Sequence, residues 1–80
     1  MRIMNDLRFS ILRFLEEAGT QVDFATLSRG TNTGQHELAA ELVILVEDRK
    51  DIRIIEKDGD QFFEITEKGT EELDELKNES

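Results

Sequence analysis

Apolar residues recur with a helical period through the first quarter of the chain and predict a helix over residues 5–18. The stripe consists of Met4, Leu7, Ile11, Phe14, Leu15 and Ala18. Gly19 follows this stripe and is a natural end for a helix. Phe9 and Leu12 lie off the stripe, so the helix carries a second, weaker apolar flank that another element can cover.

The next segment has the pattern of two helices joined by a short turn. Residues 20–22 can pair as a small strand, and Asp23 is a suitable N-cap for a brief helix over residues 24–29. Turn-forming residues occupy positions 30–34, and a third helix is expected over residues 34–48. Its buried seam consists of Leu38, Leu42, Leu45 and Val46.

Alternating β-branched and aromatic residues after position 51 predict a β-hairpin with Asp58-Gly59 as its two-residue turn. The turn sets five cross-strand pairs: Lys57 with Asp60, Ile55 with Phe62, Ile54 with Phe63, Arg53 with Glu64, and Ile52 with Ile65. Alternation then predicts a face toward the core made of Ile52, Ile54, Phe63 and Ile65. The outer face carries Ile55 and Phe62.

A last helix is expected to begin at Thr66-Glu67-Lys68-Gly69, to carry Leu73 and Leu76, and to fray over residues 77–80. The predicted order is therefore helix, short strand, helix, turn, helix, hairpin, helix, in a single domain of residues 1–80. Two helices joined by a short turn and followed by a hairpin form a winged helix-turn-helix. We expect an α+β fold with a three-helix core, a β-hairpin wing and a C-terminal helix.

Three short motifs resemble winged-helix transcriptional regulators of the broad MarR and ArsR kind. They are Phe24-Ala25-Thr26-Leu27, the leucines of the third helix, and Phe63-Glu64-Ile65-Thr66-Glu67-Lys68-Gly69 followed by Leu73. The last, aromatic-x-Ile-Thr-x-x-Gly-x-x-x-Leu, is the most specific. The resemblance implies a homodimer that binds double-stranded DNA with helix 34–48 in the major groove and the wing on the flanking backbone.

The same resemblance places candidate DNA-reading residues around the start of the third helix, and nearby basic residues are candidates for phosphate contacts. Thr31, Thr33, Gln35 and His36 would read or position the major groove, since their side chains can hydrogen-bond to bases or phosphates. Arg29, Arg53 and Lys57 would hold phosphates. Glu37 and Glu41 depart from this chemistry, because carboxylates are repelled by phosphates.

Charge weakens the DNA interpretation. The chain of 80 residues carries a net charge of −9. All of the excess of acidic over basic residues lies after residue 22, over the helix-turn-helix, wing and last helix. Non-specific DNA binding depends on clustered Lys and Arg, which this half lacks. Adaptation to a salt-rich cytoplasm is one explanation for the acidity.

The other explanation is an acidic winged-helix module that binds protein and never binds DNA. The residues expected to be apolar and exposed are Phe9, Ile44, Ile55 and Phe62. Clustered exposed apolar side chains mark interfaces. They would serve either a protein partner or the homodimer seam.

Several function classes lack their chemistry in this sequence. There is no cysteine, and His36-Glu37-Leu38-Ala39-Ala40 has alanine where the zinc-protease motif needs its second histidine. We therefore expect no enzyme activity, no metal site and no cofactor. Neither a signal peptide nor a run of 18 apolar residues is present, so the expectation is a cytoplasmic protein without a membrane contact.

Overall fold

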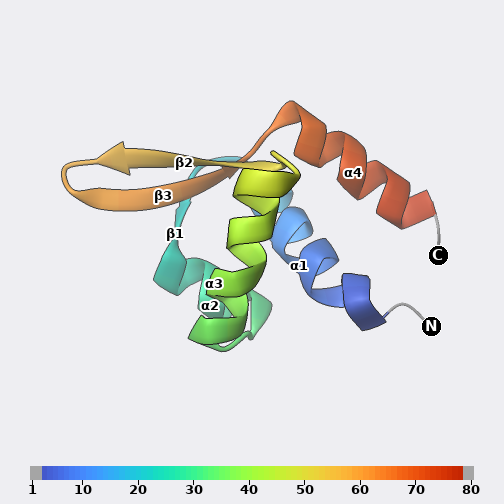
Figure 1. Cartoon of the computed structure of the whole chain (residues 1–80). Helices are drawn as coiled ribbons and strands as arrows, with labels where there is room; N and C mark the ends of the chain where they lie inside the picture. Colours follow the sequence, from blue (N-terminus) through green and yellow to red (C-terminus); the bar gives the residue numbers. More distant parts are fainter. Residues whose placement is uncertain (1–2, 79–80) are drawn as a thin grey trace.

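The computed structural model describes the backbone of residues 3–78 and the side chains of residues 7–78. These residues form an α+β fold of four α-helices, a π-helical segment and a three-stranded antiparallel sheet (Figure 1). In chain order they are α1 (Ile3–Ala18), β1 (Val22–Asp23), α2 (Phe24–Thr31), α3 (Gln35–Val43), the π-helical η1 (Ile44–Asp48), β2 (Ile52–Lys57), β3 (Asp60–Ile65) and α4 (Glu67–Asn78). Of the residues expected to fray, 77 and 78 are helical, and 79 and 80 lie outside the described residues.

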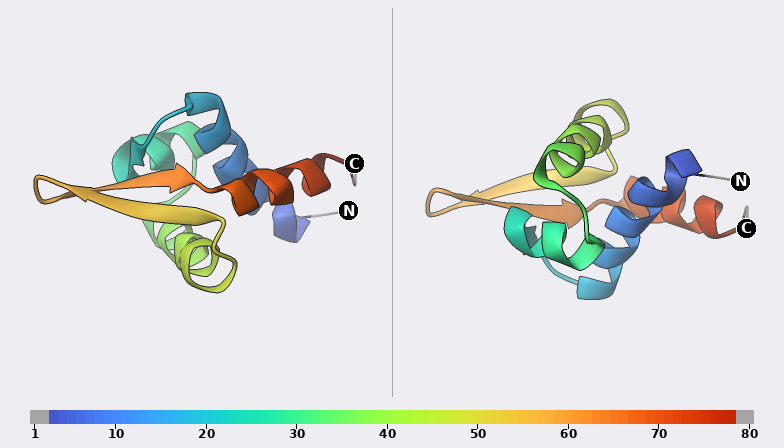
Figure 2. Two further views of the ribbon diagram at one scale, coloured as in Figure 1. Left: turned by 90° about the horizontal axis from the view of Figure 1, so that it is seen from above. Right: turned by 90° about the horizontal axis from the view of Figure 1, so that it is seen from below.

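The sheet has the order β1-β3-β2, and all five predicted hairpin pairs are confirmed. Asp58 and Gly59 have φ angles of 54° and 84°, the left-handed values that a tight two-residue hairpin turn requires. A small strand is present as predicted, but it covers Val22–Asp23 and not residues 20–22: Val22 pairs with Phe63 and Asp23 with Phe62. The hairpin extends well beyond the helices, whereas α1 and α4 lie side by side at the opposite end (Figures 1 and 2).

The core forms where α1, α2, α3 and α4 meet the base of the hairpin. Leu12, which lies off the predicted stripe, is fully buried, and Phe9 is half-buried against the same core. Both flanks of α1 are covered because α1 packs against α2 and α4. The side chain of Met4, on the predicted stripe, lies outside the described residues.

Asp23 begins α2 as predicted. Its carboxylate accepts hydrogen bonds from the backbone N–H of Thr26 at 3.4 Å and from Thr26 Oγ1 at 2.5 Å. The hydrogen bond from the Thr26 side chain lowers the pKa of Asp23 below its ordinary value of 3.8. The Asp23 carboxylate therefore supports the start of α2 while it is ionised.

The prediction that the turn begins at Gly30 is wrong, because α2 continues to Thr31 and the chain turns at Asn32, with φ of 55°. Gly30 instead lets α1 and α2 pack closely. A Cβ at this position would lie 2.3 Å from the ring of Phe14.

The third helix also differs in detail from its prediction over residues 34–48. Gly34 is the N-cap of α3, and the α-helical pattern gives way to a π-helical one at Ile44. Arg49 N–H donates to Ile44 O at 2.9 Å, a hydrogen bond that spans five residues.

Two segments, residues 49–51 and 66–69, form a hydrogen-bonded junction at the base of the hairpin. Backbone N–H of Thr66 donates to Asp51 O at 2.9 Å, and Thr66 Oγ1 donates to Lys50 O at 2.8 Å. This hairpin-base junction therefore connects the chain entering β2 to the chain leaving β3.

The hairpin-base junction gives a physical reason for the most specific sequence motif. Thr66 Oγ1 accepts a hydrogen bond from Gly69 N–H at 3.1 Å and so caps the start of α4. Gly69 is buried, and a Cβ there would lie 2.2 Å from the backbone oxygen of Asp51. Phe63 and Leu73, at the two ends of the motif, are core residues.

Glycine-to-alanine substitutions will test these close approaches. Gly69→Ala forces a Cβ against a backbone oxygen that other elements hold in place, and we expect it to destabilise the fold by about 1–3 kcal/mol. Gly30→Ala should cost less, because the half-buried ring of Phe14 can rotate away. Urea unfolding measures both, with Gly34→Ser, which meets open space, as the control. Equal stabilities of Gly69→Ala and the wild type would contradict the prediction.

Candidate functional site

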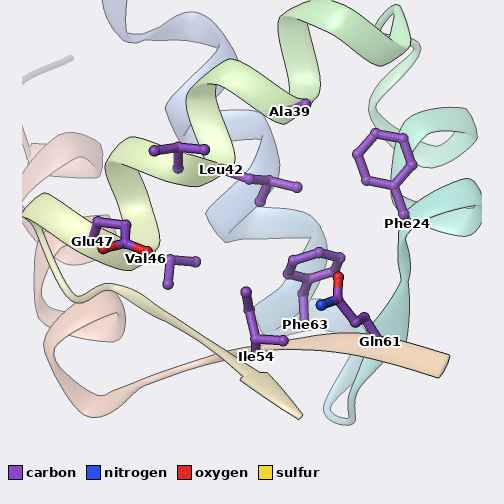
Figure 3. A pocket seen from close by; sticks show the side chains of 9 residues that line it. Phe24, Ala39, Leu42, Val46, Glu47, Ile54, Gln61 and Phe63 are labelled. Carbon is purple, nitrogen blue, oxygen red and sulfur yellow. The ribbon is translucent and has the colours of Figure 1, made fainter. Parts of the chain in front are cut away.

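An apolar groove with a volume of about 230 Å³ lies between α3 and the hairpin (Figure 3). The side chains of Leu42, Ile54 and Phe63 point toward one another across it, and Phe24 closes one end. The residues that line this α3–hairpin groove are Phe24, Ala39, Leu42, Val43, Val46, Glu47, Ile54, Gln61 and Phe63.

One wall of the groove is a second apolar strip on α3 and η1. Its residues have the spacing i, i+3, i+4 and i+7, so they lie on one side of the helix, next to the buried leucine seam. They are Ala39, Leu42, Val43 and Val46. Leu42 belongs to both surfaces and is buried, whereas Val43 is 59% exposed.

The opposite wall is the inner face of the hairpin. Ile54 and Phe63 are cross-strand partners, and their side chains share one face of the sheet. The ring of Phe63 is also 6.5 Å from that of Phe24, centroid to centroid, which joins this wall to the start of α2.

The prediction that Ile54 is buried is wrong, although its assignment to the inner face is right. Ile52, nearer the base, is 2% exposed, whereas Ile54 is 42% exposed. Phe63, directly across from Ile54 on the same face, is only 6% exposed, so the cover is lost on the edge strand β2 and not on the central strand β3.

Ion pairs connect charged side chains of the hairpin-base junction, α1, α3 and α4. Arg49 Nη2 donates to both carboxylate oxygens of Glu72, at 2.6 and 2.7 Å. These hydrogen bonds raise the pKa of Arg49. Arg8 Nε lies 3.2 Å from Glu41 Oε2, and Arg8 Nη1 lies 3.8 Å from Glu72 Oε2. These contacts tie α3 and the junction to α1 and α4.

Asp51 is the fully buried acid of this network. Arg49 Nε lies 3.5 Å from Asp51 Oδ2, and Lys68 Nζ lies 3.7 Å from Asp51 Oδ1, yet no hydrogen bond to either oxygen is present within the described part of the chain. Burial raises the pKa of Asp51 above its ordinary value of 3.8, and Glu72 acts in the same direction. Lys68, Arg49 and Arg8 oppose this rise.

Two threonines predicted to read DNA, Thr31 at the end of α2 and Thr33 in the turn, use their hydroxyl groups in hydrogen bonds to nearby backbone oxygens. Thr31 Oγ1 donates to Leu27 O at 2.8 Å, and Thr33 Oγ1 donates to Thr31 O at 3.1 Å. Ser28 Oγ donates to Thr33 O at 2.7 Å. Each hydroxyl has a single hydrogen, so in this arrangement Thr31 and Thr33 have no hydrogen left to donate to a phosphate.

Gln35 and His36 are exposed in the first turn of α3, as expected for residues that contact a partner. Gly34 precedes them as the N-cap and has no side chain to satisfy the first N–H groups of the helix. These two side chains and the helix start form one small polar surface.

The predicted phosphate-holding residues do not combine into a basic patch. Arg29 is exposed near the end of α2. Arg53 Nε lies 3.2 Å from Glu64 Oε1, and Lys57 pairs with Asp60 across the hairpin next to its turn. Arg53 and Lys57 both belong to the face of the hairpin that points away from the groove.

The residues predicted for an interface lie on separate surfaces. Phe9 packs against the core, and Ile55 and Phe62 are half-buried on the outer face of the hairpin. Ile44 is 37% exposed on η1 and is not among the residues that line the groove. The interface prediction missed Val43 and Ile54. The spacing of apolar residues on α3 could have indicated Val43.

No group of three or more His, Cys, Asp or Glu side chains that could hold a metal ion occurs among residues 7–78. Within the described residues, no helix is long and apolar enough to cross a membrane.

No protein-family model and no curated protein matches this chain. Among solved structures, the crystal structure of human N-acetylserotonin methyltransferase in complex with SAM is similar, with a TM-score of 0.62 and 21% sequence identity. The match covers 80% of this chain and 18% of that chain. At this identity the likeness shows the fold alone, so the activity of that enzyme is not carried over to this chain.

Asp51→Asn tests the effect of burying a carboxylate in the network. Because the pKa of Asp51 in the fold lies above 3.8, lowering the pH through it protonates Asp51 and removes the cost of a buried charge. We expect the wild type to gain stability relative to Asp51→Asn as the pH falls from about 7 to about 4.

Urea unfolding of both proteins at each pH measures this difference, and Asp74→Asn, on an exposed part of α4, controls for the loss of one charge. If the wild type instead lost stability relative to Asp51→Asn over this interval, the buried carboxylate would be a net stabiliser in its charged form.

Proposed function

We propose that this chain is a winged-helix domain that works by binding another protein, and that the α3–hairpin groove is the binding site. In this proposal α2 and α3 are the helix-turn-helix, and the β2–β3 hairpin is the wing. The observation that carries the proposal is the exposure of Val43 and Ile54 on opposite walls of one apolar groove. Exposed apolar surface that gathers in one hollow marks a binding site.

The size and lining of the groove favour a protein partner over a small molecule or a substrate. Its volume of about 230 Å³ is below the roughly 300–1,000 Å³ of typical small-molecule pockets, but a few apolar side chains of a partner would fit. Apart from Glu47 and Gln61 its lining is apolar. This supports a binding module rather than an enzyme, since catalysis needs convergent nucleophile, base and orienting groups.

The second candidate function is that of a homodimeric transcriptional regulator that binds duplex DNA. One observation favours it: Gln35 and His36 are exposed beside the start of α3, where free N–H groups can receive a phosphate. The acidic side chains on the same helix and the pairing of Arg53 with Glu64 weigh against strong phosphate binding.

Parallel selections on the full chain test the two functions. A displayed library of random peptides and a pool of random DNA duplexes are each enriched on the wild type. We expect peptides whose affinity falls roughly tenfold or more in Ile54→Ser, because apolar anchors dominate such contacts. Ile55→Ser is the matched control, since it makes the same change on the outer face of the same strand.

The opposite result would reassign the function. The DNA regulator would be favoured by two results together. The enriched duplexes would lose binding in the double variant Gln35→Ala, His36→Ala, and no enriched peptide would depend on Ile54. Circular dichroism of each variant confirms that the fold is retained.

A further inference from the structure

We propose that the segment bound in the α3–hairpin groove is basic, with Lys or Arg flanking the apolar side chains that enter the groove. This inference rests on the proposed function and adds the chemical class of the partner. It comes from the charges on the two walls and from the face of the hairpin on which each charge lies.

The elements that form the walls are strongly acidic. Residues 35–48 and 52–65 together hold eight carboxylates and two basic side chains, Arg53 and Lys57. Two of the eight carboxylates are paired with arginine, Glu41 with Arg8 and Glu64 with Arg53, each at 3.2 Å. Among these carboxylates, that of Glu47 lines the apolar groove.

Strand register places the two bases of the hairpin on its outer face, where Arg53 pairs with Glu64 and Lys57 with Asp60. Glu56 pairs with Gln61, which lines the groove, so Glu56 lies on the inner face beyond Ile54. Arg53 and Lys57 alternate with these residues and lie on the outer face. The inner face of the hairpin thus continues toward its tip with a carboxylate.

The helical wall contributes a carboxylate to the lining of the groove itself. Glu47 lines it from η1, within the same turn as Val43 and Val46 (Figure 3). A partner whose apolar side chains enter between α3 and the hairpin would therefore have Glu47 on one side and Glu56 on the other. Cationic side chains on that partner would be attracted to both.

The charge also decides against two other occupants. A second copy of this chain would bring another net charge of −9 toward acidic walls, and a nucleic acid would bring phosphates. Both are repelled, whereas a basic polypeptide segment is attracted and has apolar side chains to bury.

The test uses the random-peptide library at about 0.1 M salt, where surface charges act over about 10 Å. Peptides whose binding falls in Ile54→Ser but not in Ile55→Ser are sequenced and synthesised with a fluorophore. We expect an excess of Lys and Arg over Asp and Glu in these peptides. Their affinities are then measured by anisotropy for the wild type and two charge-reversal variants.

Glu47→Lys changes the groove, and Glu75→Lys makes the same change in net charge at an exposed position of α4. We expect Glu47→Lys to weaken the binding of the basic peptides about two- to fivefold more than Glu75→Lys does, because one close charge pair at a partly exposed site is worth that much. The difference should shrink at about 1 M salt.

Each outcome separates the two levels of the proposal. The basic partner would be overturned if the peptides that depend on Ile54 contain no excess of Lys and Arg. It would also be overturned if Glu47→Lys and Glu75→Lys weaken their binding equally. In both cases the groove would remain a protein-binding site. The absence of any Ile54-dependent peptide would overturn both. Sedimentation equilibrium tests for a dimer. If a dimer forms in the wild type and in Ile55→Ser but not in Ile54→Ser, the groove binds a second copy of this chain instead.

Discussion

The rest of the structure depends on the contact between residues 49–51 and 66–69 at the base of the hairpin. There Asp51 O accepts from Thr66 N–H, and Gly69 packs so closely that a side chain would collide with the same oxygen. The contact fixes where β2 begins, where β3 ends and where α4 starts. Asp51 N–H also donates to Leu45 O at 2.8 Å, so the end of the η1 helix is fixed too.

This constraint explains why the groove is open. The helices are held at the base of the hairpin. Ile52 and Phe63 are buried there, whereas Ile54, on the edge strand β2, is exposed on the same face. Apolar residues that continue past the edge of the core have no partner within the described part of the chain. Glu47 is a charged side chain within the lining of this apolar surface.

Much of the fold was predictable because local rules govern it. The Asp58-Gly59 turn sets the hairpin register, Asp23 caps α2, and the leucine seam of α3 is buried as its period indicates. Gly30 was misassigned to the turn, because a glycine needed for close packing against Phe14 looks the same in sequence as one needed for a bend. The candidate site was less predictable: Gln35 and His36 are exposed as expected, but Val43 and Ile54 were missed.

By itself, the sequence determined the elements, their order, the strand register and the acidity of the second half of the chain. These follow from residue type and spacing, which act over a few neighbouring positions. Only the tertiary structure decided that Asp51 is buried and that Val43 and Ile54 lie on opposite walls of a groove. It also decided that the hydroxyl groups of Thr31 and Thr33 donate to backbone oxygens of the chain itself. Exposure depends on where the helices pack against the hairpin, and contacts between segments distant in the sequence set that position.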